Sequence, residues 1–282
     1  MVIRKLRAKL MPLRPHFARV WGPVRTASVA FLSRTHFTAW ATLETKQRLK
    51  VDLSSTVGRS IWYRGEYERQ VEAQLRRRLK GGNVFVDVGA NVGYFSVITA
   101  EIVGPGGAVH AFEPDQRSCD LLKASLTANR LTNVYANAIA LWKEPGCLQF
   151  APERQSGLSH VLSQQESLNE RPALSVPANT LDRYMKTFPV HRVRLVKIDA
   201  EGADLAVLLG MREILARDRP TVIVETEDWA LARFGHTVED LINYLDSFGY
   251  AAYDLDGRPI HDSGEARERL ANYFVKNLVF DG

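Results

Sequence analysis

A buried strand that runs into a glycine-rich turn and then a helix is the segment with the clearest chemical use. Residues 84–88 are apolar except for Asp87, and a turn rich in glycine precedes a helix expected from Tyr94. Glycine lets a ligand approach the backbone closely, and free N–H groups at the start of a helix face that ligand. We therefore predict a cofactor site that contains Asp87, Gly89, Asn91, Gly93, Tyr94 and Ser96.

The side chains of this turn favour a cofactor with a cationic amino-acid end over a dinucleotide. In dinucleotide sites the pattern G-x-G-x-x-G lets the helix pack closely on the strand, and the turn faces a pyrophosphate. Counted from Gly89, the second and third glycines are replaced by Asn91 and Tyr94. Asp87 would repel a pyrophosphate, whereas it can accept a hydrogen bond from an ammonium group. An NAD-dependent oxidoreductase is therefore the alternative interpretation.

Glu113 ends the second expected strand, 24 residues after Gly89. An acidic residue at this place can accept hydrogen bonds from both hydroxyls of a ribose. The alternative is a cap for the helix that follows Pro114. A nucleoside joined to an amino-acid moiety is S-adenosylmethionine, which we predict as the cofactor. We also assign Asn137 and Ala138, in the third strand, to this site.

Further carboxylates follow the fourth and fifth core strands. Residues 197–204 read KIDAEGAD, and Glu225 ends the fifth strand. Ligands of open α/β sheets bind beyond the carboxyl ends of the strands, near the switch in strand order. Asp87, Glu113, Asp199 and Glu225 should therefore converge there. Glu201 and Asp204 have an alternative role, in which they favour the positive end of the next helix.

Three residues are candidates for the general base that a methyl acceptor needs. They are Asp199 and Glu201 in the fourth-strand segment and His160, in a polar stretch that could cover the pocket. The alternative for His160 is an exposed loop position. The carboxylates could instead bind a divalent cation that acidifies the acceptor. No histidine or fixed spacing supports such a site, so we predict no metal.

The elements that position these residues alternate between strand and helix from residue 83 onward. Buried apolar strands separated by helices indicate a parallel sheet with right-handed crossovers. We predict a Rossmann-like α/β fold with a mostly parallel seven-stranded sheet, helices on both faces and an antiparallel edge whose two strands are joined by a loop. The expected strands are 84–88, 108–112, 134–140, 193–198, 221–224, 250–255 and 273–280, and the helices are 66–79, 94–103, 119–129, 204–216 and 238–248. Short strands are expected at 40–43, 49–53 and 60–63.

Charge is distributed unevenly along the 282 residues. Residues 1–50 contain 11 Lys and Arg against one Glu, a formal charge of +10, which leaves −5 for residues 51–282. The mildly acidic main body argues against nucleic-acid binding. No run of 18 apolar residues or signal-peptide core is present, so we expect a cytoplasmic protein. The basic amphipathic start suggests peripheral contact with the inner face of a membrane through residues 1–40, or a frayed tail.

The order of these motifs resembles that of the FkbM-type methyltransferases from about residue 60 to residue 250. The matching segments are residues 65–68, 87–96, 111–114, 179–182, 197–204, 208–211 and 219–220. The resemblance implies a class I methyltransferase that acts mostly on hydroxyl groups of sugars and natural products. It also implies that Gly89, Asn91, Gly93 and Glu113 bind the cofactor and that Asp199 and Glu201 line the reaction pocket.

Two features depart from the family's pattern. Asp204 stands where the family commonly has Glu, and residues 1–50 lie largely outside the resemblance. We divide the chain into a basic tail (1–39), an extension of small strands and a helix (40–82) and a methyltransferase domain (83–282). The leading hypothesis is an O-methyltransferase for a small-molecule or glycan acceptor, such as a sugar, glycolipid or secondary metabolite. The alternatives are the oxidoreductase and a non-catalytic cofactor-binding module at a membrane. The oligomeric state is not predicted.

Overall fold

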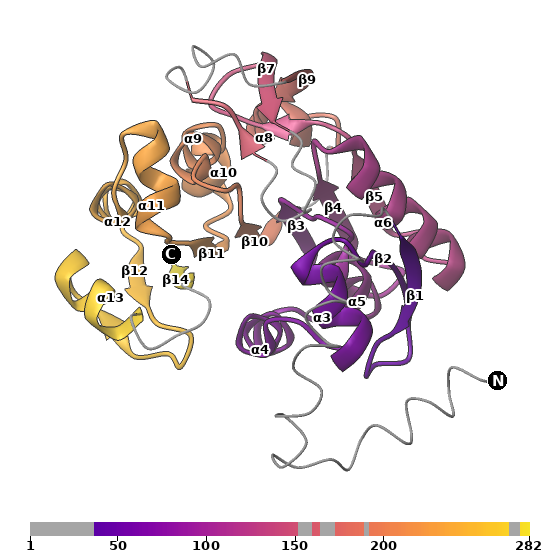
Figure 1. Ribbon diagram of the computed structural model, residues 1–282. Helices are drawn as coiled ribbons and strands as arrows, with labels where there is room; N and C mark the ends of the chain where they lie inside the picture. The colour runs from indigo at the N-terminus through magenta and orange to yellow at the C-terminus, as the bar shows by residue number, and fades with distance from the viewer. Residues whose placement is uncertain (1–36, 152–159, 164–172, 189–191, 271–276) are drawn as a thin grey trace, which may run out of the picture.

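The computed structural model describes residues 37–151, 160–163, 173–188, 192–270 and 277–282 (Figure 1). Its main sheet has the strand order β13-β12-β14-β11-β10-β3-β4-β5. The strands are β3 (Val84–Val88), β4 (Ala108–Phe112), β5 (Val134–Asn137), β10 (Val193–Ile198), β11 (Thr221–Glu225), β12 (Ala251–Tyr253), β13 (Pro259–Ile260) and β14 (Asn277–Asp281). The predicted α/β fold is confirmed, with eight strands in this sheet among the described residues rather than seven.

Strand order reverses beside β3, at the centre of the sheet. From β3 the chain moves outward through β4 to β5, and it returns to the other side of β3 with β10 and β11. All these neighbours are parallel, so their carboxyl ends lie at one edge. β14 runs antiparallel between β11 and β12, which gives the predicted antiparallel region. The edge of the sheet beside β3 is therefore where a ligand is expected.

Each central strand contributes to two hydrophobic cores, one on either face of the sheet. In β3, Val84, Val86 and Val88 join one core, whereas Phe85 joins the other. Helices that contribute buried residues to the first core include α8 (Leu181–Met185), α9 (Asp204–Leu209), α10 (Arg212–Arg217) and α12 (Val238–Asp246). The second core contains residues of α3 (Thr56–Arg64), α4 (Arg69–Arg78), α5 (Tyr94–Val103) and α6 (Gln116–Asn129). Burial on both faces explains why these strands read as continuous apolar runs.

The N-terminal extension packs against the helices of the second core. Strands β1 (Thr38–Thr42) and β2 (Arg48–Asp52) form an antiparallel hairpin, drawn in indigo in Figure 1 beside α6. The outer edge of β2 bonds to α6, because the N–H of Lys50 donates to Ser125 Oγ at 2.8 Å and that of Arg48 to Asn129 Oδ1 at 2.8 Å. None of the helices in the described ranges is both long and apolar enough to cross a membrane.

Two expectations for the extension are wrong. Residues 60–63 belong to helix α3 and form no strand, because Ser55 caps the helix by accepting from the N–H of Gly58, and Gly65 ends it in a left-handed conformation. The next helix, α4, begins at Arg69 rather than at Glu66.

The third expected strand is divided between two sheets. β5 ends at Asn137, and β6 (Ala140–Leu141) pairs with β9 (Leu174–Asn179) in a four-stranded sheet of order β6-β9-β7-β8. The other members are β7 (Gly146–Ala151) and β8 (His160–Val161). Figure 1 shows β7 and β9 at the top of the view, apart from the main sheet. Residues 140–141, 146–151, 160–161 and 174–179 therefore form a small sheet that is separate from the main one.

Two further boundaries differ in the C-terminal half. The helix expected at 204–216 is divided into α9, which ends at Leu209, and α10, which begins at Arg212; Gly210 lies at the break, where an added Cβ would be 2.1 Å from the carbonyl oxygen of Trp142. The last strands are not joined by a loop alone, since β13 and α13 (Ser263–Leu270) lie between β12 and β14. Short helices α11 (Asp228–Leu231) and η2 (Ala232–Phe234) follow β11.

Candidate functional site

A pocket lies at the carboxyl ends of the central parallel strands. Its lining combines the turn after β3, the end of β4, the segment after β10 and the segment after β11. Among the predicted site residues, the lining contains Gly89, Asn91, Tyr94, Glu113, His160, Asp199 and Glu201. The sheet topology therefore brings together side chains that are more than 100 positions apart in the sequence.

The glycines of the turn allow parts of the protein itself to meet. Gly89 has a φ of +73°, and an added Cβ would lie 1.8 Å from the carbonyl oxygen of Asp199. Gly93 has a φ of +87°, and its Cβ would lie 2.2 Å from Leu122 Cδ1. The sequence predicts that these glycines allow a ligand to approach the backbone. The structure shows that they also let the segments after β3 and β10, and helices α5 and α6, pack closely.

Asp87 and Ser96, which flank this turn in the sequence, are joined by a hydrogen bond. Ser96 Oγ donates to Asp87 Oδ2 at 2.6 Å, while Asp87 Oδ1 is buried and accepts no hydrogen bond from any described residue. Burial raises the pKa of Asp87, and Lys197 and Ser96 oppose that shift. A buried carboxylate oxygen without a donor suits an ammonium group, so this residue fits the amino-acid end of the expected cofactor.

Glu113 is a preorganised acceptor on the nucleoside side of the pocket. The N–H of Asn91 donates to its Oε2 at 2.8 Å, and the N–H of Asp115 donates to its Oε1 at 2.8 Å. Burial raises its pKa to about 8, and these two backbone donors oppose the rise. Each oxygen keeps a further lone pair, so the carboxylate fits the two hydroxyls of a ribose.

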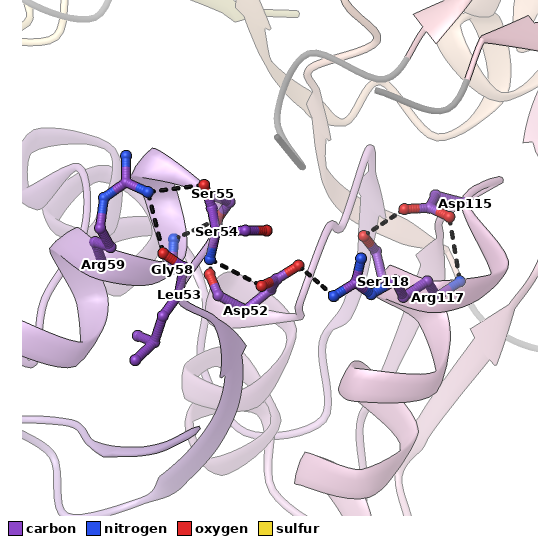
Figure 2. Close-up of polar contacts among 9 residues, drawn as sticks. All are labelled: Asp52, Leu53, Ser54, Ser55, Gly58, Arg59, Asp115, Arg117 and Ser118. Atoms are coloured by element: carbon purple, nitrogen blue, oxygen red, sulfur yellow. Dashed lines mark hydrogen bonds and ion pairs between the residues drawn. The ribbon is translucent and has the colours of Figure 1, made fainter. Parts of the chain in front are cut away.

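The extension holds the segment that follows Glu113. Figure 2 shows Asp52, at the end of β2, paired with Arg117 in the first turn of α6, with 2.7 Å between Oδ2 and the guanidinium. Asp115 caps the same helix and accepts from Ser118 Oγ at 2.9 Å. On the other side of Asp52, Arg59 donates to the carbonyl oxygens of Leu53 and Ser54. The buried carboxylate of Asp52 therefore joins the N-terminal extension to the helix that follows Glu113.

The reaction side of the pocket is built around Lys197 and Asp199 on β10. Lys197 is 1% exposed, and its Nζ lies 2.8 Å from Asp199 Oδ2. Burial lowers the pKa of Lys197, but the carboxylates of Asp199, Glu68 and Asp87 outweigh this effect and raise it. Asp204 accepts from the N–H groups of Ala200 and Gly202 at 3.0 Å each. Asp204, the first residue of α9, therefore organises the turn that precedes this helix.

Glu201 and Glu225 are carboxylates that repel their neighbours. Burial, followed by the charge of Asp199, raises the pKa of Glu201 to about 8. Burial and the charges of Asp199 and Asp204 raise the pKa of Glu225 as well. Glu201 has a φ of +52°, a conformation that costs energy in a residue other than glycine and is common at functional sites. Both side chains line the pocket.

His160 and Trp229 complete the wall. His160 lies in β8 and is 4% exposed, so it is not the exposed loop residue that the alternative interpretation expected. Trp229, in α11, lines the pocket and remains 52% exposed, with the Arg233 guanidinium 4.5 Å from its ring centre. The site thus offers a partly open aromatic surface beside several carboxylates.

Other predicted residues lie away from the pocket surface. Asp87, Gly93, Ser96, Asn137 and Ala138 are not among the residues that line the pocket. The Asn137 amide donates to the carbonyl oxygens of Ala111 and Tyr135. The neighbouring residues 139–141 line the pocket instead. A cofactor role for Asn137 and Ala138 stays a prediction.

Residues of the extension also reach the site, although the sequence pattern does not predict that they do. Val57 and Tyr67 line the pocket, and Glu68 lies close enough to raise the pKa of Lys197. The only signal was the GEYE segment at residues 65–68, which carried part of the family resemblance. Tyr94 contacts this extension, because its hydroxyl donates to Glu72 Oε2 at 2.6 Å.

Within the described ranges, no three His, Cys, Asp or Glu side chains are arranged to hold a metal ion.

Comparison with known proteins gives one family match. The model of the methyltransferase FkbM domain matches residues 87–252, more than half of the chain. No curated protein matches.

Similar solved structures include methyltransferase FkbM from Methylobacillus flagellatus KT, which is 15% identical with a TM-score of 0.45. The match covers 71% of this chain but only 43% of that one. TYW2 from M. jannaschii, in complex with AdoMet, is 16% identical with a TM-score of 0.45, over 88% of this chain and 85% of that one. A SAM-dependent methyltransferase from Aquifex aeolicus is 12% identical with a TM-score of 0.41, over 76% and 87%.

The family match begins at Asp87 and takes in the glycine-rich turn, Glu113 and the segment after β10. These are the residues whose geometry suits an ammonium group and a ribose, so the match and the pocket agree on the cofactor. The chain belongs to the FkbM methyltransferase family and is an S-adenosylmethionine-dependent methyltransferase.

Proposed function

We propose that this protein methylates a hydroxyl group of a small-molecule or glycan acceptor, such as a sugar, a glycolipid or a secondary metabolite. When bound, S-adenosylmethionine supplies an electrophilic methyl group. The protein must align the acceptor oxygen with that group and remove its proton. Alignment can contribute on the order of 7–11 kcal/mol, and a general base adds a factor of about 10²–10⁴.

The observation that carries this proposal is the position and basicity of Glu201. Its carboxylate lines the pocket beside Asp199, and its pKa is raised to about 8. A base is most effective when its pKa lies near the working pH, so Glu201 is suited to accept a proton from a hydroxyl group. Asp199 is less suited, because it is already paired with Lys197 at 2.8 Å. His160 is the second candidate for the base.

The lining supports an uncharged polyol over a polyanion. Glu201, Glu225 and Glu227 face the pocket and would repel the phosphates of a nucleic acid. Hydroxyl groups can donate to carboxylates, and the exposed ring of Trp229 can pack on the apolar face of a sugar. We therefore infer that nucleic acid is not the acceptor.

A transfer screen tests the proposal. Purified protein would receive cofactor with a labelled methyl group, together with panels of sugars and glycolipids, phenolic metabolites, amines and structured RNA. We expect label on hydroxyl-bearing acceptors and at least 100-fold less with Glu201→Gln. Glu239→Gln, which changes an exposed carboxylate on α12, is the matched control. Label found on amines or RNA alone would overturn the proposal.

We also propose that the N-terminal residues bind an anionic membrane surface. Residues 1–50 carry a formal charge of +10, and most of them lie outside the described ranges. At the start of the described chain, Phe37 and Trp40 are exposed, and the Arg48 guanidinium lies 4.5 Å from the Trp40 ring centre. Aromatic and basic side chains together are typical of membrane interfaces.

Vesicle binding tests this second proposal. A full-length variant with Arg4, Lys5, Arg7 and Lys9 changed to Gln should bind phosphatidylglycerol vesicles at least tenfold more weakly, because each cation contributes about 1 kcal/mol near an anionic surface. Its affinity for S-adenosylhomocysteine should not change. Equal vesicle binding by the variant and the original protein would contradict membrane contact.

A further inference from the structure

Three carboxylates surround the buried ammonium of Lys197. Asp199 contacts it at 2.8 Å, Asp87 lies opposite it on the neighbouring strand β3, and Glu68 approaches from the extension. On the fourth side, the Phe95 ring centre lies 5.1 Å from Lys197 Nζ. When all four groups are ionised, the cluster has a formal charge of −2.

Glu68 is turned into this cluster by an uncommon backbone conformation. It occupies the N-cap position of α4 with φ 42° and ψ 60°, and its side chain makes no capping bond. A left-handed conformation is costly for a residue other than glycine and is retained where the surroundings require it. The carboxyl group instead lies close to the Tyr67 hydroxyl, Lys197 and Asp199. Tyr67 itself lines the pocket, so Glu68 lies immediately behind the pocket wall.

The positive charge of Lys197 is compensated by other carboxylates than Glu68. Asp199 already forms a close ion pair with it, and Asp87 is a second acidic neighbour. Oε2 of Glu68 and Oδ1 of Asp87 are both buried, and neither accepts a hydrogen bond within the described part of the chain. Buried acceptors without donors are costly. The ammonium group of the cofactor suits Asp87, so the charge that remains on Glu68 indicates a second cation from outside the protein.

We propose that Glu68 is a specificity-determining residue that makes the pocket prefer the positively charged cofactor S-adenosylmethionine over its neutral-sulfur product, S-adenosylhomocysteine. The two molecules share their nucleoside and amino-acid ends and differ by the methyl group and the sulfonium charge. A negative charge behind the pocket wall attracts the sulfonium through a medium of low polarity and has little effect on a thioether. The inference depends on the cofactor and not on which acceptor is methylated.

The same charge should make the preference depend on pH. Burial raises the pKa of Glu68 to about 7, with Lys197 opposing the rise and Asp199 and Asp87 adding to it. Below this pH Glu68 is largely protonated and its attraction for a cation is lost. A bound cation in turn stabilises the ionised form. Preference for the charged cofactor should therefore weaken as the pH falls from 8 to 6.

Calorimetric titration of the full chain tests the proposal. The ligands are S-adenosylmethionine, S-adenosylhomocysteine and sinefungin, which carries a protonated amine near the place of the sulfonium. Glu68→Gln keeps the shape and removes the charge. Glu66→Gln is the matched control, because this carboxylate, two residues away, is paired with Arg69 at the start of α4.

We expect Glu68→Gln to lower the preference for S-adenosylmethionine over S-adenosylhomocysteine about fivefold at pH 8, because it removes one negative charge from the cluster around Lys197. Sinefungin should weaken together with S-adenosylmethionine. Glu66→Gln should stay within twofold of the original protein. The preference of the original protein should also fall between pH 8 and pH 6, a measurement that needs no variant.

Two results would overturn the inference. Equal weakening of all three ligands by Glu68→Gln would show that Glu68 only supports the fold, and an unchanged preference at both pH values would show that its charge does not reach the cofactor. Neither result depends on methyl transfer. The acceptor proposal fails separately, in the transfer screen.

Discussion

The two sides of the pocket use the same kind of side chain in opposite surroundings. On the nucleoside side, Glu113 receives a backbone N–H on each oxygen. On the reaction side, Glu201 and Glu225 lie near Asp199 and Asp204, whose charges add to the effect of burial. A carboxylate held by fixed donors is suited to binding hydroxyl groups without moving. Burial raises the pKa of both Glu113 and Glu201 to about 8, so the two sides differ in the fixed backbone donors of Glu113 and in the like charges around Glu201, which suit proton transfer.

The largest effect is expected when the carboxylate of Glu201, on the reaction side of the pocket, is replaced. Glu201→Gln keeps the size of the side chain and cannot accept a proton, so the rate of methyl transfer should fall by about 10²–10⁴. Single-turnover measurements with an acceptor from the screen would show this loss. Affinity for S-adenosylhomocysteine should stay within twofold. A rate within threefold of the original would assign the base to Asp199 or His160 and break the proposed division.

The second prediction concerns pH and the stability of the ligand-free protein. Burial raises the folded-state pKa of Glu68 to about 7 and those of Glu113 and Glu201 to about 8. A carboxyl group with a raised folded-state pKa stabilises the fold fully below its unfolded pKa, near 4.5, and this stability is lost as the pH rises through the folded pKa. The melting temperature should therefore fall between pH 5 and pH 8.

Differential scanning calorimetry would measure this fall, which should amount to several degrees, because about 1 kcal/mol shifts the melting temperature by roughly 2–4 °C at this size. Glu201→Gln should flatten the dependence, since Gln does not titrate. A melting temperature that rises steadily from pH 5 to pH 8 would contradict the assigned environment of these carboxylates.

A smaller effect should follow from weakening the contact between the N-terminal extension and helix α6, which follows Glu113. Arg117→Ala removes the ion-pair partner of Asp52, whose side chain is 3% exposed. The loss should destabilise the protein by about 1–2 kcal/mol, since a buried charge is left less well compensated. Lys123→Ala, an exposed change on the same helix, is the control and should have little effect. Equal melting temperatures for both variants would show that the extension does not depend on this pair.

The parts of the molecule that the sequence could predict are those defined by neighbouring residues. Strand β3, its turn and helix α5 follow from an apolar run, two glycines and a helical pattern within about 20 positions. The approach of Asp199 to Glu113 follows from the rule that parallel strands share an edge. These steps need only local patterns and one topological rule.

The remaining parts depend on contacts between distant segments. β6 pairs with β9 across more than 30 residues, and the intervening polar stretch shows no alternation that would predict the pairing. Tyr67 and Glu68 reach the site because α4 packs on α5, a docking that no residue spacing reveals. Helix α3 was misassigned because its short apolar run, read without the Ser55 cap, resembled a strand.

The most direct test of the account is calorimetric titration with S-adenosylhomocysteine of the original protein, Glu113→Ala and Glu201→Gln. Loss of hydrogen bonds from two ribose hydroxyls to a charged group should weaken binding to Glu113→Ala by roughly 100-fold or more, since each bond to a charged group contributes a net of about 1.5–3 kcal/mol. Glu201→Gln should bind within twofold of the original. Strong binding by Glu113→Ala, or a loss confined to Glu201→Gln, would contradict the division of the pocket into a binding side and a reaction side.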